Sequence, residues 1–172
     1  MTFGRDSMVL VVMGVAGSGK TTVGSLLARR LGRQFQEGDS LHPRSNVEKM
    51  RVGRSLTDED RAPWLERVAG WIDERLDAGG SGVVTCSALK RSYRDLLNRR
   101  GSGVVFVFLD VSKELASERL RARQGHFMPA AMLDSQFADL ERPGAREPVI
   151  SVDASQPPES IVEQVLSLRL DR

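Results

Sequence analysis

The fold of this chain is decided by the stretch MVLVVMGVAGSGKT, residues 8–21. Residues 8–13 form a continuous apolar run, which is typical of a central parallel strand that is covered on both faces. Residues 14–21 match the pattern G-x-x-x-x-G-K-[ST], and a helical pattern follows them through Leu31. A strand, a glycine-rich loop and a helix in this order predict a phosphate-binding loop.

The chemistry of phosphate binding explains the spacing in this loop. Its glycines let successive backbone N–H groups turn toward phosphate oxygens, and the helix N-terminus adds partial positive charge. Lys20 can reach the β- and γ-phosphates, and the Thr21 hydroxyl can ligate Mg²⁺. We therefore predict a site for a nucleoside triphosphate with Mg²⁺. The residues expected to bind it here are Gly14, Val15, Ala16, Gly17, Ser18, Gly19, Lys20, Thr21 and Thr22.

The composition excludes several other classes of protein. A chain of 172 residues suggests one domain, and 40% hydrophobic with 28% charged residues is ordinary for a soluble globular protein rather than a disordered or fibrous one. No apolar run approaches the roughly 18–20 residues that span a bilayer. The formal net charge of +2 is a small excess, so it does not predict binding to nucleic acid or to a membrane.

The single cysteine and the first residues of the chain indicate where in the cell the protein is expected. Cys86 has no partner for an intramolecular disulfide, which fits a reducing environment, and it is expected to be a small buried residue rather than a nucleophile. Residues 1–7 contain no signal-peptide core and are expected to form a flexible leader. We expect a cytoplasmic protein in which residues 8–172 form a single P-loop kinase domain.

Strand-like runs alternate with helical patterns along the whole chain. The expected strands are residues 8–13, 34–37, 83–86, 103–109 and 148–153, and the expected helices include residues 57–77, 92–100, 112–123 and 158–170. This order predicts an α/β fold, a doubly wound parallel sheet with helices on both faces. Residues 41–56 are expected to hold a short helix with loops. Residues 124–148 show no clear period, which is typical of a functional or mobile segment.

Three helix ends carry local signals. Gly32 lies where a C-cap is common, and Ser112 is expected to cap the helix that follows it. Thr57 and Asp60 have the spacing of a capping box. Pro63, in the first turn of that helix, is tolerable because the early N–H groups lack intrahelical partners.

The end of the second expected strand is a candidate substrate site. Asp39 follows this strand, so a parallel sheet places it at the carboxyl edge beside the phosphate loop. A carboxylate there can accept a proton from a substrate hydroxyl, or orient it, as the hydroxyl attacks the γ-phosphate. His42 is a candidate substrate contact. The alternatives are a turn-capping role for Asp39 and a backbone-bonded turn role for His42.

Two arginines are candidates for a mobile lid at about residues 120–145. Arg119 and Arg123 are four residues apart and share a helix face beside the irregular segment. A lid that carries them would close over the triphosphate, neutralise charge on the transferred phosphoryl group and exclude water. The alternative is a solvated basic face that pairs with Glu118 or Asp139.

Other nucleotide-binding classes fit less well. GTPases need an N-K-x-D motif, which is absent. ABC and AAA+ ATPases typically have a larger domain and an apolar strand that ends in Asp-Glu, whereas the run at residues 104–109 is followed by Asp110 and Val111. Asp110 is either a metal ligand or, more simply, a strand-end residue. A small kinase for a small molecule remains.

With these motifs in place, the sequence resembles the gluconokinase family, in the branch of P-loop folds that holds the shikimate kinases and nucleoside monophosphate kinases. The resemblance runs from about residue 9 to residue 168. It is carried by MGVAGSGK at 13–20, GDSLHP at 38–43, NVEKM at 46–50, LTDEDR at 56–61, PWL at 63–65, CSALK at 86–90, YRD at 93–95, RQGHFM at 123–128, SQF at 135–137 and LERP at 140–143.

The resemblance implies transfer of the ATP γ-phosphate to the 6-hydroxyl of D-gluconate, with Mg²⁺ required. It also implies a five-stranded parallel sheet and, commonly, a homodimer. Lys20, Asp39 and Arg123 are the expected catalytic residues, and Arg119 and Arg123 are expected to contact ATP from the lid. The expected contacts to this polyhydroxylated acid are Asp39, His42, Lys49, Arg61, Lys90 and Arg94.

Several alternatives stay open at this point. Arg61 is as compatible with pairing to Asp58 in its own helix as with substrate, and Lys90 and Arg94 are compatible with a solvated helix. Arg54 and Ser55 depart from the short acidic-Pro pair that the family pattern predicts. A shikimate kinase would show three glycines at residues 86–88, where this chain has Cys-Ser-Ala. A nucleotide-binding module that switches a protein partner would bind nucleotide without turnover.

Overall fold

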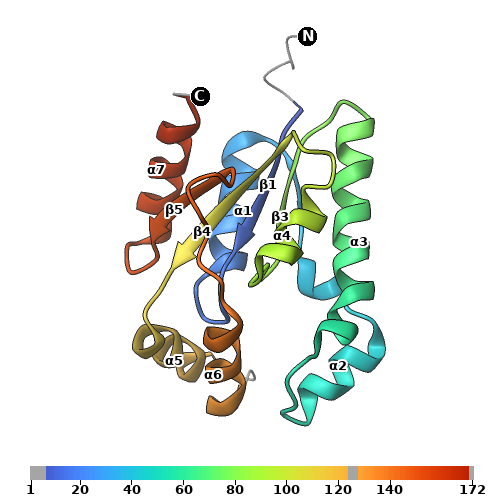
Figure 1. Ribbon diagram of the computed structural model, residues 1–172. Helices are drawn as coiled ribbons and strands as arrows, with labels where there is room; N and C mark the ends of the chain where they lie inside the picture. Colours follow the sequence, from blue (N-terminus) through green and yellow to red (C-terminus); the bar gives the residue numbers. More distant parts are fainter. Residues whose placement is uncertain (1–6, 124–127, 171–172) are drawn as a thin grey trace.

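A computed structural model describes residues 7–123 and 128–170, so residues 1–6 of the expected leader lie outside the described residues. The elements follow the expected alternation (Figure 1). They are β1 (Val9–Met13), α1 (Lys20–Leu31), β2 (Gln34–Gln36), the 3₁₀ turn η1 (Gly38–Leu41), α2 (Arg44–Arg51), α3 (Asp58–Asp77), β3 (Gly82–Thr85), α4 (Arg91–Leu97), β4 (Val104–Asp110), α5 (Lys113–Ala122), α6 (Ala130–Asp139), β5 (Val149–Asp153) and α7 (Pro158–Leu170).

The five strands form one parallel sheet in the order β2-β3-β1-β4-β5. Strand β1 lies at the centre, with Val12 opposite Thr85 of β3 on one side and Val107 of β4 on the other. All five residues of β1 are buried, as its uninterrupted apolar run predicts. The chain changes direction across the sheet at β1, and ligands of such sheets bind beyond the carboxyl ends of the strands at this point.

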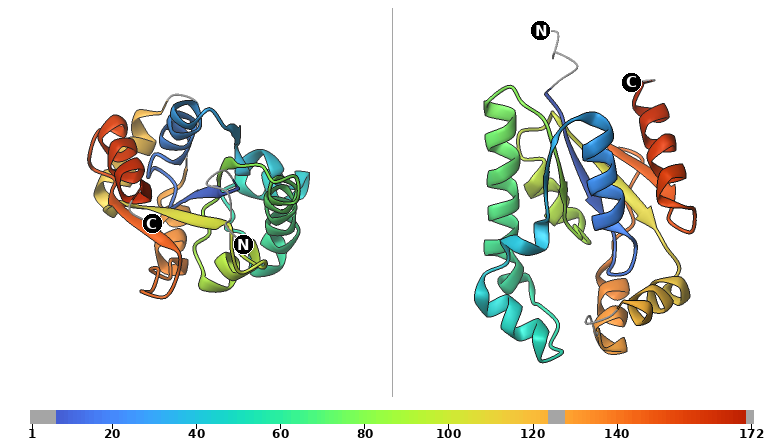
Figure 2. Two further views of the ribbon diagram at one scale, coloured as in Figure 1. Left: turned by 90° about the horizontal axis from the view of Figure 1, so that it is seen from above. Right: turned by 180° about the vertical axis from the view of Figure 1, so that it is seen from behind.

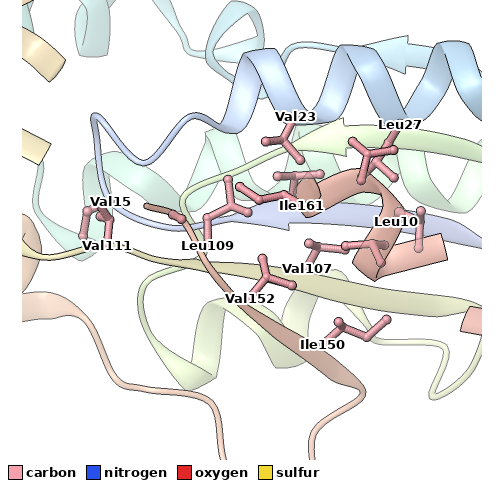
Figure 3. Close-up of a cluster of buried hydrophobic side chains, with 14 of the residues drawn as sticks. Leu10, Val15, Val23, Leu27, Val107, Leu109, Val111, Ile150, Val152 and Ile161 are labelled. Atoms are coloured by element: carbon pink, nitrogen blue, oxygen red, sulfur yellow. The ribbon is translucent and has the colours of Figure 1, made fainter. Parts of the chain in front are cut away.

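Helices cover both faces of the sheet, which confirms the predicted doubly wound fold. Helices α1 and α7 lie on one face, and α3 and α4 lie on the other (Figure 2). Figure 3 shows the core under the first face, where Val23 and Leu27 of α1 and Ile161 of α7 meet side chains of the strands. The second core holds Trp64 and Leu65 of α3. No helix among the described residues is long and apolar enough to cross a membrane.

The predicted helix signals are confirmed. The Gly32 C-cap is left-handed, with φ of 63°. The Thr57 side chain accepts from the Asp60 backbone N–H, and the Asp60 carboxylate accepts from the Thr57 backbone N–H, which is a complete capping box. The Ser112 side chain caps α5 by accepting from the Leu115 N–H. The Thr57 and Ser112 caps give partners to backbone N–H groups that the first helical turn leaves unpaired, and the Gly32 N–H donates to carbonyl oxygens of the last turn of α1.

Residues 124–148, which show no clear period in the sequence, contain a helix that the sequence analysis did not predict, α6. Met132, Leu133 and Phe137 give α6 an apolar stripe at helical spacing, and Met132 and Leu133 are buried. Polar residues and flanking prolines, including its N-cap Pro129, conceal this short stripe in the sequence. Residues 124–127, where part of the expected lid falls, lie outside the described residues.

The arrangement leaves the carboxyl edge of the sheet bounded on two sides. Helix α2 lies on one side of this edge and helices α5 and α6 lie on the other (Figure 1). At the start of η1, Gly38 packs so closely on β3 that a Cβ there would meet the Thr85 carbonyl oxygen at 1.7 Å. This contact brings Asp39, the next residue, to the edge beside the phosphate loop.

Candidate active site

The phosphate loop joins β1 to α1 through three glycines with positive φ. Gly14, Gly17 and Gly19 have φ of 146°, 80° and 98°, a region that residues with a side chain rarely adopt. Gly17 also has no room for a side chain, because a Cβ would lie 2.6 Å from the Ala116 carbonyl oxygen of α5. The loop therefore needs glycine for its own curvature and for its contact with α5.

The Lys20 side chain folds back onto the start of the phosphate loop. Its Nζ donates to the carbonyl oxygens of Gly14, at 3.0 Å, and Val15, at 2.9 Å. Burial lowers the pKa of Lys20, while the nearby carboxylate of Asp39 opposes this shift. The ammonium group is thus already drawn toward the position where phosphate oxygens are expected, and a bound anion would replace the two carbonyl groups as its partner.

Thr21 offers an oxygen for a metal ion, and its partner is a residue that the sequence analysis did not single out. The Thr21 hydroxyl donates to Glu37 Oε2 at 2.6 Å, and the Thr85 hydroxyl donates to Glu37 Oε1 at 2.6 Å. Hydroxyl and carboxylate oxygens are the hard donors that Mg²⁺ prefers, so the residues present fit this ion. No cluster of three or more His, Cys, Asp or Glu side chains that could hold a metal ion occurs in residues 7–123 and 128–170.

Two cavities meet at the phosphate loop. The larger has a volume of about 980 Å³ and lies between α2 and α6. The smaller, of about 300 Å³, lies between the loop and the start of α7. Gly17, Gly19 and Arg123 line both. A phosphate chain that follows the loop from the smaller cavity therefore ends in the larger one.

Asp39 and His42 both line the larger cavity, as their predicted roles require. The Asp39 side chain is 75% exposed, and its Oδ1 lies 4.0 Å from His42 Nε2. The imidazole is only 4% exposed and stacks on Trp64 with 4.1 Å between ring centroids. Trp64 in turn donates from its indole nitrogen to the Gly38 carbonyl at 2.8 Å. Burial lowers the pKa of His42, and the Asp39 carboxylate opposes this shift.

Arg119 and Arg123 line the smaller cavity together. Arg119 joins the phosphate loop to the β5–α7 connection, because it donates to the carbonyl oxygens of Ser18, at 3.2 Å, and Ala154, at 2.5 Å. Arg123 follows the last residue of α5 and is exposed. In this state Arg119 supports the cavity wall, and Arg123 is the arginine at the junction of the two cavities.

Arg61 lines the larger cavity and is not paired with Asp58, the alternative that the sequence left open. Its Nη1 donates to Asp139 Oδ2 at 3.0 Å and to the Tyr93 hydroxyl at 3.1 Å. Asp58 instead accepts hydrogen bonds from Lys90 and Tyr93. Arg61 thus adds a nearly buried positive charge to the cavity wall.

Three of the expected substrate contacts do not line either cavity. Lys49 pairs with Asp60 at 2.5 Å, and Lys90 pairs with Asp58 at 2.9 Å. Arg94 is 1% exposed, and its donors go to Glu147 and to backbone carbonyl oxygens, including that of Ala88. Arg94 therefore stabilises the turn before α4 in this structure rather than facing a ligand.

Asp110 and Cys86 take the structural roles that the sequence analysis gave as the simpler interpretations: a strand-end residue and a small buried residue. Asp110 pairs with Arg142 at the end of β4 and does not line the larger cavity. Cys86 is buried, and burial raises the pKa of its thiol to about 12, so the thiol stays protonated and is a poor nucleophile.

Sequence reasoning missed Glu37 and Gln136. Gln136, on α6, accepts from the backbone N–H of Ala16 at 2.7 Å and so ties α6 to the phosphate loop. The signal for Gln136 was a polar residue on the apolar face of α6, four residues after Met132 and next to Phe137. Glu37 stands two residues before Asp39, and an acidic pair at this spacing at a strand end was the available signal.

Comparison with known proteins places this site in context. The model of a family described as an AAA domain matches residues 9–143. A gluconokinase of Gluconobacter oxydans strain 621H is 54% identical over 163 residues, which cover 95% of this chain and 92% of that protein. The thermosensitive gluconokinase of Escherichia coli strain K12 is 42% identical and covers 94% of this chain and 89% of its own length.

Solved structures agree with these relatives. A gluconokinase from Sinorhizobium meliloti 1021 superimposes with a TM-score of 0.87 at 45% identity, over 97% of this chain and 94% of that one. An unliganded sugar kinase from Janibacter sp. HTCC2649 has a TM-score of 0.88 at 47% identity, over 96% and 95% of the two chains. The likeness therefore covers nearly the whole chain and is not confined to the phosphate loop.

Proposed function

This chain belongs to the gluconokinase family, and from this premise we propose that it transfers the γ-phosphate of ATP to the 6-hydroxyl of D-gluconate. One observation carries the proposal for the site: the phosphate loop and Arg123 line two cavities at once. The nucleoside would occupy the smaller cavity, and the triphosphate would follow the loop. The sugar acid would occupy the larger cavity, where the γ-phosphate ends.

The loop and Lys20 hold the phosphates in this proposal. Backbone N–H groups of the loop and the N-terminus of α1 face the anion, and Lys20 exchanges its two carbonyl partners for phosphate oxygens. Thr21 would hold Mg²⁺, with Glu37 accepting a hydrogen bond from the Thr21 hydroxyl so that the lone pairs of its oxygen stay available. When bound, Mg²⁺ supplies charge neutralisation on the phosphate oxygens.

Asp39 orients the attacking hydroxyl of gluconate. Its carboxylate is open to the larger cavity and lies on the residue after Gly38, which is fixed against β3. Phosphoryl transfer has a loose transition state that needs little covalent help, so positioning is the main task of this group. His42 and Arg61 line the same cavity and would contact other oxygens of the substrate.

Arg123 and the segment around α6 complete the site in this proposal. Arg123 stands at the junction of the cavities, where charge develops on the transferred phosphoryl group. Residues 120–145 would act as a lid that excludes water, which otherwise competes with gluconate for the phosphate. A homodimer stays a prediction that rests on the family resemblance.

The experiment that tests this function compares D-gluconate with its 6-deoxy analogue, with ATP and Mg²⁺ present. We expect ADP release with D-gluconate but not with the 6-deoxy analogue. The phosphorus NMR signal of the product should couple to the protons on carbon 6. Equal ADP release with the 6-deoxy analogue, or a phosphate on another oxygen, would contradict the proposed position of transfer. ATP with enzyme and no acceptor is the control for hydrolysis.

A further inference from the structure

A buried asparagine contacts His42, which lines the larger cavity. Asn46, on α2, is 3% exposed, and its Nδ2 makes two contacts. It donates to the Asp60 backbone carbonyl at 2.8 Å and lies 3.2 Å from His42 Nδ1. A carbonyl oxygen can only accept, so it is the amide nitrogen, not the oxygen, that faces Asp60.

The protonation of the imidazole follows from this orientation. The second N–H of the Asn46 amide is directed at His42 Nδ1, so Nδ1 must accept and therefore carries no proton. In a neutral ring the proton then sits on Nε2, the nitrogen that lies 4.0 Å from Asp39 Oδ1. We infer that Asn46 is a positioning residue that locks His42 in the Nε2–H tautomer, so that His42 and Asp39 together form a donor–acceptor pair for one substrate hydroxyl.

This pair matches the chemistry of a hydroxyl group. A hydroxyl placed between the two side chains donates its proton to the Asp39 carboxylate and accepts from Nε2–H, which fixes the direction of its remaining lone pair. With the proton on Nδ1, an acceptor nitrogen would face an acceptor carboxylate, and one hydroxyl proton could serve only one of them. The inference rests on the proposed function, since it assigns the pair to a hydroxyl of the sugar acid.

The surroundings keep the ring neutral as well as oriented. The charged groups that act on the imidazole are Asp39, from η1, and Arg61, from α3, and they act in opposite directions. Burial against Trp64 is the largest influence, and it lowers the pKa of His42. A neutral ring matters because an imidazolium would also carry a proton on Nδ1, which would then face the N–H of Asn46 and have no acceptor.

The direct test reads the tautomer in the wild-type protein by long-range nitrogen–proton NMR of the imidazole rings at a pH above the His42 pKa. The chain has two histidines, so a His126→Gln variant assigns the signals. We expect His42 to show a protonated Nε2 and an unprotonated Nδ1. A protonated Nδ1, or a rapid average of both tautomers, would overturn the inference whether or not the protein turns over gluconate.

A variant of Asn46 tests how its contact with His42 affects the tautomer and the turnover of gluconate. In Asn46→Asp a carboxylate faces Nδ1, so we expect Nδ1 to become protonated and the His42 pKa to rise above its wild-type value. We also expect kcat/KM for gluconate to fall about tenfold or more, the scale of one lost hydrogen bond, with KM for ATP unchanged. Asn98→Asp, the same change at the end of α4, is the matched control. It should alter neither the tautomer of His42 nor kcat/KM for gluconate.

The outcomes separate the inference from the proposed function. If Asn46→Asp does not fold, Asn46→Ala removes the donor without adding charge and should give a mixture of tautomers. A His42 spectrum unchanged in a folded Asn46 variant would contradict the lock. Turnover that is absent with gluconate in a wild type that shows the Nε2–H tautomer would contradict the proposed function and leave the lock standing.

Discussion

Arg61 and Asp139 form an ion pair, 3.0 Å from Nη1 to Oδ2, that joins the long helix α3 to the end of α6. The guanidinium side chain is 8% exposed and the carboxylate 27%. The pair therefore connects the wall of the larger cavity to the helix that is tied to the phosphate loop through Gln136. Its partners come from segments that are far apart in the sequence.

Removal of this carboxylate should loosen the cavity wall. We expect Asp139→Ala to lower the free energy of unfolding by about 2 kcal/mol, because it leaves a nearly buried guanidinium with a lost partner, and to raise KM for gluconate. Asp134→Ala, on the same helix, removes an exposed pair with Lys113 and should cost less than about 0.5 kcal/mol. Equal losses of stability in the two variants would contradict a larger contribution of the partly buried Arg61–Asp139 pair to the free energy of unfolding.

The close contact of Gly38 with β3 predicts an unusually sensitive glycine. A Cβ at Gly38 would lie 1.7 Å from the Thr85 carbonyl oxygen, so Gly38→Ala must displace η1 or β3. We expect a loss of about 2–4 kcal/mol in chemical denaturation, and a loss of turnover because Asp39 moves. Gly70→Ala, on α3 with nothing within 4 Å, should be neutral or stabilise by about 0.5–1 kcal/mol.

Lys20 is expected to matter for turnover and not for folding. Its partners are carbonyl groups of its own loop, so Lys20→Ala should leave circular dichroism and the thermal midpoint close to wild type. The kcat should fall by about 10³-fold or more, since electrostatic stabilisation of the phosphoryl group is the main source of catalysis. Lys113→Ala, on the surface of α5, is the control. A folded Lys20→Ala with near wild-type turnover would refute the assignment of the site.

Asp60 should make stability depend on pH in acid. The ammonium of Lys49 and the backbone N–H of Thr57 lower the pKa of Asp60 from 3.8 to about 2. A lowered pKa in the folded state contributes stability that is fully present above 3.8 and is lost as the pH falls toward 2. The free energy of unfolding should therefore fall less steeply over this range in Asp60→Asn than in wild type.

Lys49→Met provides the matched variant for this prediction, because it removes the first cause of the shift and keeps the carboxylate. It should also reduce the slope between pH 4 and pH 2. Slopes that are the same in wild type and in both variants would contradict the assigned cause of the lowered pKa.

Local signals account for the parts of the fold that the sequence predicted well. The all-apolar run of β1 needs two covered faces, and the glycines of the loop need positive φ, whatever the rest of the chain does. The capping box at Thr57 is likewise complete within four residues. These features depend on neighbouring residues, which a sequence displays directly.

The errors concern choices that tertiary packing makes. Arg94 and Arg61 are both arginines on helices near the site, yet Arg94 turns inward to Glu147 and Arg61 faces the cavity. Nothing local distinguishes them, because their partners come from segments 53 and 78 residues away. Glu37 was missed for the same reason: its role depends on Thr85, which only the pairing of β2 with β3 brings beside it.

The measurement that tests the central claim most directly is ADP release by the wild-type protein with ATP and Mg²⁺, given D-gluconate, shikimate, glucose, AMP or no acceptor. The account predicts release that depends on D-gluconate, with 6-phosphogluconate as the product. Release with D-gluconate that does not exceed the background without acceptor would contradict it. ADP release with another acceptor would keep the phosphate loop as the nucleotide site but reject D-gluconate as the substrate. Binding of nucleotide without turnover of any acceptor would indicate a switch module instead.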